Sequence, residues 1–253
     1  MLASLSVKAQ ITVDMDDMPA VDDKILYSNT ADITGIDFSD TGPDFEWDFS
    51  TLTPVAQDVD TFISIEDTPF IYRIIFQTQT DANLALKVQS LPTFPAMELT
   101  EMYRYFSNIS NRYSEDGFAL TLNGIPFPIT FSEPDVLYEF PLNFQDDYSS
   151  NATFVLQIPG IAYFSVDRTR TNTVDGWGTL TTPFGTFETL RVYSEISEYD
   201  SIYIDSLGTG FPVSRNYIEY KWLAKGMGLP VCTVTQEGLV NTVSYLDSLR
   251  IPG

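Results

Sequence analysis

The stretch from Val174 to Ser194 constrains the fold of this chain more than any other. It reads V-D-G-W-G-T-L-T-T-P-F-G-T-F-E-T-L-R-V-Y-S, with alternating side-chain character on both sides of a Thr-Pro-Phe-Gly reversal. Alternation with a period of two is typical of a β-strand, and Pro followed by Gly favours a turn. We predict a β-hairpin, with Pro183 at the second position of the turn and Gly185 ending it at positive φ.

Similar alternating segments occur along the whole chain. The 18 Phe and 14 Tyr residues favour strands, because aromatic and β-branched side chains fit a pleated, half-buried surface. Asn123-Gly124 and Ser114–Gly117 are turn signals between such segments. The expected strands cover residues 10–13, 24–29, 33–38, 45–52, 55–65, 83–89, 102–113, 118–122, 125–131, 135–142, 153–158, 163–169, 174–182, 186–204, 216–223, 231–236 and 240–246.

One segment favours a short helix instead. Asp67-Thr68-Pro69 supplies an N-cap with Pro just inside it, and the isoleucines that follow have helical spacing, which predicts a helix over Phe70–Gln77. We therefore expect an all-β fold. It is a predominantly antiparallel meander that forms a curved sheet, a half-barrel or a sandwich, with at most one or two short helices. Residues 10–253 are expected to form one domain, because no repeat and no low-complexity linker divides them.

The chain has no histidine and one cysteine, Cys232. This composition excludes Ser-His-Asp and Cys-His catalysis, His-ligated metal centres and an intrachain disulfide. Cys232 stands in an apolar run and is expected to be buried and unreactive. We assign no catalytic residue and no cofactor-binding residue, and expect a protein that is not an enzyme.

The formal net charge of -22 restricts the partners of the chain. A surface this acidic repels phosphate backbones and anionic lipid headgroups, so we expect no nucleic acid partner. No apolar run reaches the length of a membrane span, and we expect no membrane insertion. Cations and carbohydrate remain open as ligands.

Two residue sets are weak candidates for binding. The first is an acidic loop after the first expected strand. It lacks the residue order of an EF-hand, so calcium is left open only at a looser site. The second is the three tryptophans, which could stack on a sugar or pack in the core. The candidate metal ligands are Asp14, Asp16, Asp17, Asp22 and Asp23, and the candidate ligand platform is Trp47, Trp177 and Trp222.

Residues 1–9 resemble the end of a secretory signal, with an apolar segment that finishes in Val7-Lys8-Ala9. We interpret them as the remnant of a signal peptide, which makes Gln10 the expected first residue of the exported protein. The absence of a second cysteine and of histidine-based chemistry agrees with a secreted, extracellular or cell-surface location.

Several longer motifs resemble a known group of proteins. They are Trp47-Asp48-Phe49-Ser50, Tyr138-Glu139-Phe140-Pro141-Leu142, the segment 170–178, the segment 182–192 and the segment 220–230. Together they look like the N-terminal domain of uncharacterised Bacteroidetes surface proteins that carry a C-terminal sorting domain read by the type IX secretion system. The resemblance implies export and a cell-surface home. No sorting domain is recognisable before Gly253, so we expect it to have been removed or to lie in a longer protein.

A weaker similarity is architectural. The Gly185–Val192 strand followed by the Trp222–Pro230 strand looks like the final strands of lipoprotein-carrier-like half-barrels, in which a curved antiparallel sheet holds an apolar ligand. Fold alone does not establish function.

Three functions follow as expectations. The first is a non-catalytic extracellular or cell-surface module that is adhesive or self-assembling, with other copies of itself, other cell-surface proteins or extracellular glycan as partners. The second is a ligand carrier or binding domain with a concave sheet, for an apolar or glycan ligand. The third is a glycan hydrolase that uses two carboxylates. Acidic residues near aromatics that could serve the third are Glu98, Glu101, Glu115 and Asp116.

Overall fold

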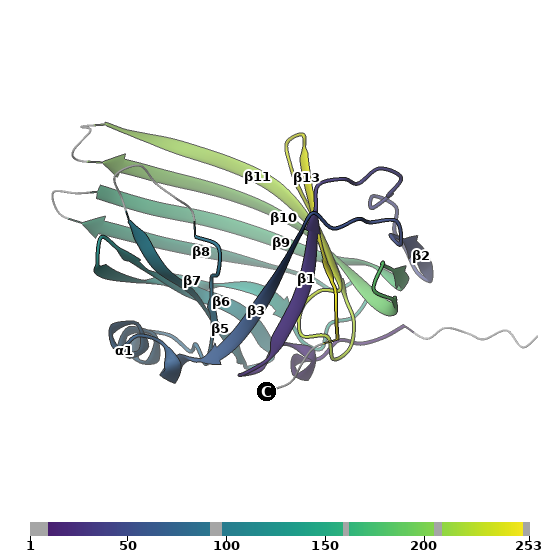
Figure 1. Cartoon of the computed structure of the whole chain (residues 1–253), viewed down its shortest axis with the longest axis horizontal. Coiled ribbons are helices and arrows are strands. Elements are labelled where there is room, and N and C mark those ends of the chain that lie inside the picture. Colours follow the sequence, from purple (N-terminus) through teal and green to yellow (C-terminus); the bar gives the residue numbers. More distant parts are fainter. Residues whose placement is uncertain (1–9, 92–97, 159–161, 205–208, 250–253) are drawn as a thin grey trace, which may run out of the picture.

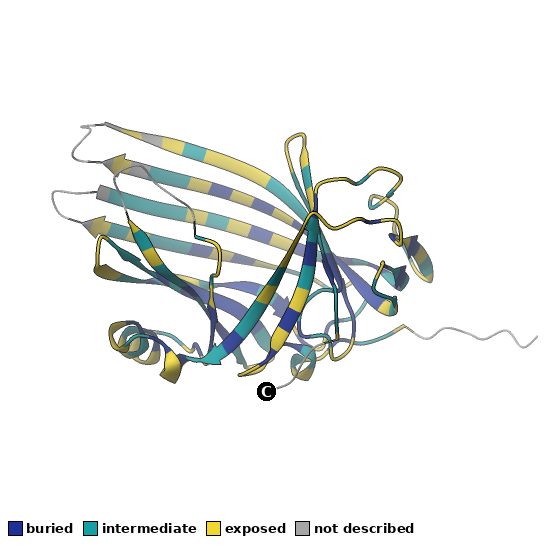
Figure 2. Cartoon of the chain, viewed as in Figure 1, coloured by how far each residue is buried: buried dark blue, intermediate teal, exposed yellow. Residues whose placement is uncertain are grey.

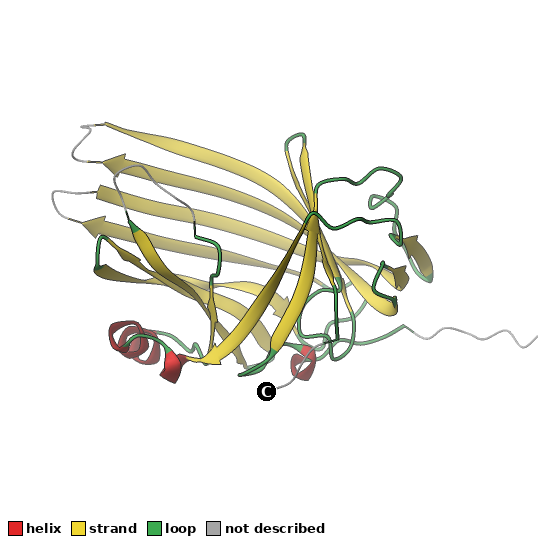
Figure 3. Cartoon of the chain, in the orientation of Figure 1, coloured by secondary structure: helices red, strands yellow, loops and turns green. Residues whose placement is uncertain are grey.

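The computed structural model describes residues 10–91, 98–158, 162–204 and 209–249. Its strands join in one curved 13-stranded sheet (Figures 1 and 3), which confirms the expected all-β class. The expected signal remnant, residues 1–9, lies outside the described residues. The strands are β1 (Lys24–Thr30), β2 (Phe45–Asp48), β3 (Ala56–Ser64), β4 (Leu84–Lys87), β5 (Leu99–Ile109), β6 (Arg112–Leu122), β7 (Ile125–Glu139), β8 (Asp147–Ile158), β9 (Ala162–Thr181), β10 (Thr186–Ile204), β11 (Thr209–Leu223), β12 (Cys232–Glu237) and β13 (Val240–Leu246).

The order of the strands brings the two ends of the chain together. Along the sheet the order is β2-β9-β10-β11-β12-β13-β1-β3-β4-β5-β6-β7, and β8 pairs with the other part of the β9 edge. The pairs are antiparallel except that of β2 with β9, which is parallel. Strand β1 lies between β3 and β13, so an early strand and the last strand are neighbours in the sheet.

The predicted hairpin is the longest ladder of the sheet. Strands β9 and β10 pair from Thr181 and Thr186 outward to Ala162 and Ile204. The reversal is closed by hydrogen bonds between Thr182 and Gly185, which donate to each other's carbonyl oxygens at 2.8 and 3.2 Å. One detail of the prediction was wrong: Gly185 is not among the positive-φ residues. The turn is held by these paired bonds and does not need a left-handed glycine.

Of two other predicted turns, one is confirmed and one was wrong. Asn123 and Gly124 connect β6 to β7 with φ angles of 50 and 76°, which is the predicted hairpin turn. The predicted turn at Ser114–Gly117 was wrong, because those residues lie inside β6, at a β-bulge opposite β5. The actual reversal is at Ser110-Asn111, where both residues adopt positive φ.

The predicted strand at residues 33–38 is a loop. Its apolar residues, Ile33, Ile36 and Phe38, pack against the main core from outside the sheet, so they cover a hydrophobic surface without being part of a strand. The ring of Phe38 lies 5.2 Å from that of Tyr220 on β11. This loop, residues 31–44, therefore covers part of one face of the long strands.

Helix α1 (Phe70–Gln79) confirms the predicted helix and extends it by two residues. Two short 3-10 helices, η1 (Met15–Asp17) and η2 (Ile65–Asp67), accompany it. Tyr72 and Phe76 of α1 are fully buried against β5, where the ring of Phe76 stacks on Tyr105 at 3.6 Å. No helix among the described residues is long and apolar enough to cross a membrane.

The two ends of the curved sheet, β7 and β8, meet through side chains. The Ser150 hydroxyl of β8 donates to Asp135 of β7 at 3.0 Å, and Tyr148 donates to the Leu137 carbonyl at 2.9 Å. Within the described ranges no backbone ladder joins these two strands, so the curved sheet is open along this seam. Figure 2 shows buried residues concentrated where the strands converge and alternating exposure along the free ends of β8–β11.

Candidate functional site

The long strands β9, β10 and β11 have two chemically different faces. The inner face carries Arg168 and Arg170 of β9, which reach residues of β7 across the curve of the sheet. The outer face carries Thr171 and Glu195, whose side chains point the opposite way because adjacent residues alternate along a strand. Each face contains one site that could hold a ligand.

Ion pairs dominate the inner face. Asp135 accepts hydrogen bonds from Arg170 at 2.9 and 3.1 Å and from Arg168 at 3.2 Å, while its side chain is 1% exposed. Burial alone would raise the pKa of Asp135, but the charges of Arg170 and Arg168 outweigh it and lower that pKa. The carboxylate is therefore ionised and binds the two guanidinium groups to the β7 side of the sheet.

A second cluster continues the inner network. Glu219 lies 3.0 Å from both Arg170 and Lys221, and the Lys221 ammonium lies over the Tyr138 ring at 5.5 Å. Burial opposes ionisation of Glu219, but the charges of Lys221 and Arg170 prevail and lower its pKa to about 2. Further pairs on the same face are Arg168–Glu198, Arg215–Glu198, Arg215–Asp200 and Arg104–Glu115.

An inner cavity of about 350 Å³ lies beside these ion pairs. Its walls come from both sides of the curve, with Asp60 and Arg104 on one side and Arg170 and Lys221 on the other. The basic groups of these walls already pair with acidic side chains, and Leu137, Leu229 and Leu246 add apolar surface to the lining.

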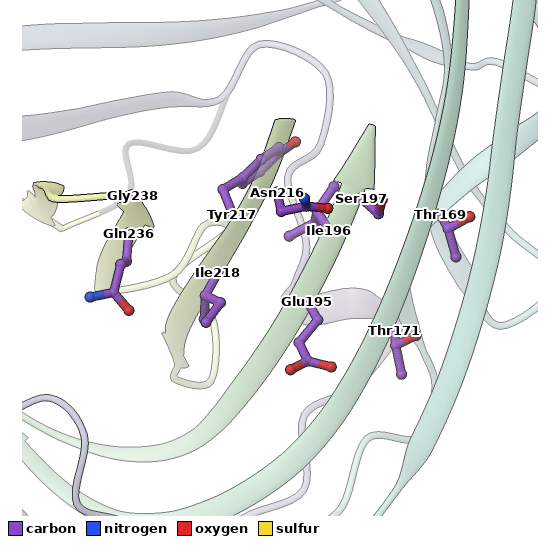
Figure 4. Close-up of a pocket in the computed structure, with 10 residues that line it drawn as sticks. All are labelled: Thr169, Thr171, Glu195, Ile196, Ser197, Asn216, Tyr217, Ile218, Gln236 and Gly238. Carbon is purple, nitrogen blue, oxygen red and sulfur yellow. The ribbon is translucent and has the colours of Figure 1, made fainter. Parts of the chain in front are cut away.

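The outer face is organised in rows that run across the strands. In one row Thr171, Glu195, Ile218 and Gln236 are direct cross-strand partners on β9, β10, β11 and β12. Figure 4 shows Thr171, Glu195 and Ile218 projecting to the same side of the sheet. A second row, two residues further along, consists of Thr169, Ser197 and Asn216.

These two rows line a groove of about 610 Å³, which we call the outer groove. The turn between β12 and β13 contributes Gly238 to its lining. Loop 31–44 covers the face next to it, where Phe38 packs on Tyr220 and the Arg191 guanidinium donates to the Phe38 and Asp40 carbonyls. The outer groove thus lies beside the area of the sheet that loop 31–44 covers.

Tyrosines extend the outer face on both sides of the groove. Tyr193 donates a 2.8 Å hydrogen bond to Glu195, which fixes the position of that carboxylate. Burial and this carboxylate raise the pKa of Tyr193 to about 12, so the phenol remains a hydrogen-bond donor. On the other side, Tyr199 and Tyr203 are 50% and 41% exposed on the same strand. They lie about 13 Å apart, because residues four positions apart share a face at ~3.3 Å per residue.

The tryptophans proposed as a ligand platform lie in the hydrophobic core or against it. Trp47 and Trp222 are buried, with their rings in edge-to-face contact at 5.8 Å, so they are core residues. Trp177 is half-buried against the same core. Among the described side chains of the long strands, the exposed aromatics are instead Tyr199 and Tyr203, which were not among the predicted site residues.

The acidic N-terminal residues serve local structure. Asp17 accepts backbone hydrogen bonds from Asp14 and Gly226 at 2.8 Å, and Asp14 lies 3.6 Å from Lys225. Asp23 is buried and accepts from the Ala20 amide. Asp16 and Asp22 are exposed. Among the described residues no group of three or more His, Cys, Asp or Glu side chains could hold a metal ion.

The acidic residues considered for glycan hydrolysis do not share one site. Glu115 pairs with Arg104 on the inner face, and Asp116 is buried beside Ser107 near α1. Cys232 is fully buried, and burial raises the pKa of its thiol, as expected for an unreactive residue. The outer groove was missed because Thr, Ser and Asn on alternating positions look like any solvated strand face. Only the cross-strand register shows that they form one surface.

Among known proteins, only solved structures show a similarity to this chain. No family model matches the chain, and no curated protein matches it. Among solved structures, a proposed lipoprotein from Parabacteroides distasonis has a TM-score of 0.39 and 10% identity, over 95% of this chain and 100% of that one. A proposed exported protein with a YmcC-like fold from Bacteroides fragilis has a TM-score of 0.29 and 10% identity, over 95% and 99%.

The hypothetical lipoprotein YmcC from Escherichia coli has a TM-score of 0.26 and 11% identity, over 60% of this chain and 81% of that chain. TM-scores below 0.5 do not establish a shared fold. The function of the chain therefore has to be argued from its own residues.

Proposed function

We propose that this chain is an exported, non-catalytic surface module that binds a neutral glycan in the outer groove. The observation that carries the proposal is the chemistry of the groove lining. Among the described residues that line it, Glu195 alone is charged, whereas 19% of the whole chain is charged. A lining with one charged residue and a mixture of polar and apolar groups, on so acidic a protein, fits a ligand that is uncharged and has both hydroxyl groups and apolar faces.

The groups in the groove match sugar hydroxyls. Thr and Ser hydroxyls and the amides of Asn216 and Gln236 both donate and accept hydrogen bonds, as sugar hydroxyls do. Tyr199 and Tyr203 add two exposed rings on which apolar sugar faces can pack. Their spacing of about 13 Å suits an extended chain of several sugar units better than a single ring.

The same groove supports binding better than hydrolysis. Glycoside hydrolysis by a carboxylate pair needs two acidic groups about 5–10 Å apart. Within the described lining of the outer groove Glu195 has no second carboxylate beside it. The acidic residues that lie close to one another are on the inner face, where they are paired with arginine and lysine.

Export is supported by the sequence. Residues 1–9 have the character of a signal-peptide end, and the chain has one cysteine, which is buried and free. The resemblance to Bacteroidetes surface proteins points to the same location and to type IX secretion. Detection of the native protein in washed whole cells by surface proteolysis tests the location.

Binding can be measured by affinity electrophoresis against soluble neutral polysaccharides such as xylan, glucomannan and laminarin, with anionic alginate for comparison. We expect retardation by at least one neutral polymer and none by alginate. Retardation by alginate alone, or by none of the neutral polymers, would contradict the proposal.

Substitutions in the groove locate the binding. The double variant Thr171→Val, Asn216→Ala removes one hydroxyl and one amide from two adjacent rows without touching the core. Each lost hydrogen bond is worth about 1 kcal/mol, so affinity is expected to fall roughly tenfold or more. Thr51→Ala changes an exposed loop residue that does not line the groove. It is the control and should bind as the wild type does.

Self-assembly is a second candidate, favoured by the edge of β11. Its first eight residues, 209–216, pair with β10 on one side, whereas β12 pairs only from Tyr217 onward. An unpaired edge can accept a strand from another molecule, although Pro212 removes one donor from it. Light scattering of the purified chain over a hundredfold range of concentration should then show growing mass. A monomer throughout rules out this candidate and leaves the glycan proposal intact.

A further inference from the structure

A small cavity at the end of helix α1 has no role in the proposed glycan site. It has a volume of about 360 Å³ and is lined by residues of the helix end, of β6 and of β7. The helix end contributes Thr78, Gln79 and Asp81, β6 contributes Asp116, and β7 contributes Ser132. Oxygen-bearing side chains thus meet here from three separate elements.

Asp116 is the least accessible of these groups. Its residue is 1% exposed, and the Ser107 hydroxyl donates to its Oδ1 at 2.7 Å. The other carboxylate oxygen, Oδ2, is buried without a hydrogen-bond partner. A buried carboxylate oxygen without a partner is costly, so its presence needs an explanation.

Backbone geometry directs Asp116 to this place. Consecutive residues of β5, Tyr105 and Phe106, pair with Gly117 and Glu115, so Asp116 is the extra residue of a β-bulge. Bulges re-aim a side chain relative to a regular strand, and they are often found beside functional sites. Without the bulge, alternation along β6 would place Asp116 differently relative to the helix end.

The helix end makes the cavity still more negative. The last carbonyl groups of a helix lack intrahelical amide partners and carry the negative end of its dipole. Helix α1 ends at Gln79 and has no basic residue in its last turn. Asp81 lies two residues beyond this end, after the C-cap residue Thr80. Burial, together with the charge of Asp81, raises the pKa of Asp116 to about 6, even though the Ser107 hydroxyl, the Asp81 backbone amide and Arg112 act in the opposite direction.

We propose that this cavity is a calcium site in which Asp116, Asp81 and the carbonyl groups at the end of α1 are ligands. Calcium takes six to eight oxygen ligands, including carboxylates, carbonyls and water, in flexible geometry. Two carboxylates, neutral oxygens and solvent meet this requirement with a low ligand charge. The expected dissociation constant is about 10⁻⁴–10⁻³ M, the range of extracellular modules. Calcium would tie α1 to β6.

The test uses the whole chain, stripped with EDTA and dialysed at pH 8, which lies above the raised pKa of Asp116. Isothermal titration with calcium chloride is expected to show one ion per chain, and 5-mM calcium is expected to raise the melting temperature. Asp116→Asn and Asp81→Asn should each abolish both effects. Asp16→Asn, in the acidic loop singled out by the sequence, should retain them.

Three results would overturn the proposal. They are an unchanged melting temperature of the wild type, a calcium effect that survives in both aspartate variants, and an equal effect of magnesium, which would indicate ionic screening. Asp116→Asn without calcium should melt at or above the wild-type temperature at pH 8, because it removes an uncompensated buried charge. If it fails to fold, Asp81→Asn decides the outcome, since Asp81 is exposed.

Discussion

Asp135→Asn is expected to destabilise the protein by roughly 3–5 kcal/mol at pH 7, the cost of removing one partner from a buried ion pair. Asp135 is 1% exposed and is shared by Arg170 and Arg168, which are 5% and 21% exposed. The substitution keeps the shape of the side chain but leaves two guanidinium groups without their common carboxylate. Urea denaturation followed by circular dichroism measures the change.

The pH dependence of this loss separates charge from packing. Because the folded-state pKa of Asp135 is lowered from its ordinary value of 3.8, its ionised form contributes stability above that value. That contribution disappears as the pH falls through the folded-state pKa. The difference between wild type and Asp135→Asn should therefore shrink below pH 3.8. A difference that stays constant with pH would show that the variant acts through packing.

Glu66→Gln is the matched control for this experiment. Glu66 pairs with Arg73 at 3.6 Å, but the two side chains are 62% and 31% exposed. Exposed pairs contribute about 0–1 kcal/mol, because solvent screens the charges. A similar loss in both variants would contradict the argument from burial.

Gly178→Ala is expected to cost roughly 3–5 kcal/mol, as large as any core truncation. Gly178 has φ of 150°, and a Cβ atom there would lie 2.0 Å from the Phe45 carbonyl oxygen and 2.5 Å from the Phe45 nitrogen. Both obstacles are backbone atoms of β2, which pairs in parallel with β9 at this residue. The short strand would have to move away, and Trp47 beside it would lose its buried position.

The melting temperature and the near-ultraviolet circular dichroism of the tryptophans measure this effect. Gly185→Ala is the control, since its added Cβ would meet only the Phe187 ring at 3.7 Å, an ordinary contact distance. That variant should melt within a few degrees of the wild type. Equal destabilisation by both alanines would show that the turn, and not the β2 contact, is the sensitive point.

Local signals in the sequence predicted local structure well. The Asn123-Gly124 turn, helix α1 and the β9–β10 hairpin each depend on neighbouring residues, and each is present. The turn at Ser114–Gly117 was mispredicted because Asp and Gly also occur at β-bulges, which the sequence does not distinguish from turns. Residues 33–38 were predicted as a strand but form a loop outside the sheet, where their apolar side chains pack on the core.

The candidate sites depend on contacts between residues that are far apart in the sequence. Thr171, Glu195 and Asn216 become one groove only through the register of β9, β10 and β11. Asp81 and Asp116 are 35 positions apart, and only the packing of α1 brings them to one cavity. The tryptophans drew attention by residue type, whereas burial decides their role, and burial is a property of the whole sheet.

The position of β1 between β3 and β13 has a consequence for how the chain acquires its structure. Tyr27 pairs with Leu246, so the middle of the sheet joins segments separated by almost the full length of the described chain. Loop closure over such a distance is entropically costly, and folds built on distant pairings form slowly. While the chain is being synthesised, β1 lacks one neighbour until residue 246 has emerged. The sheet is thus completed only when almost the whole described chain is available.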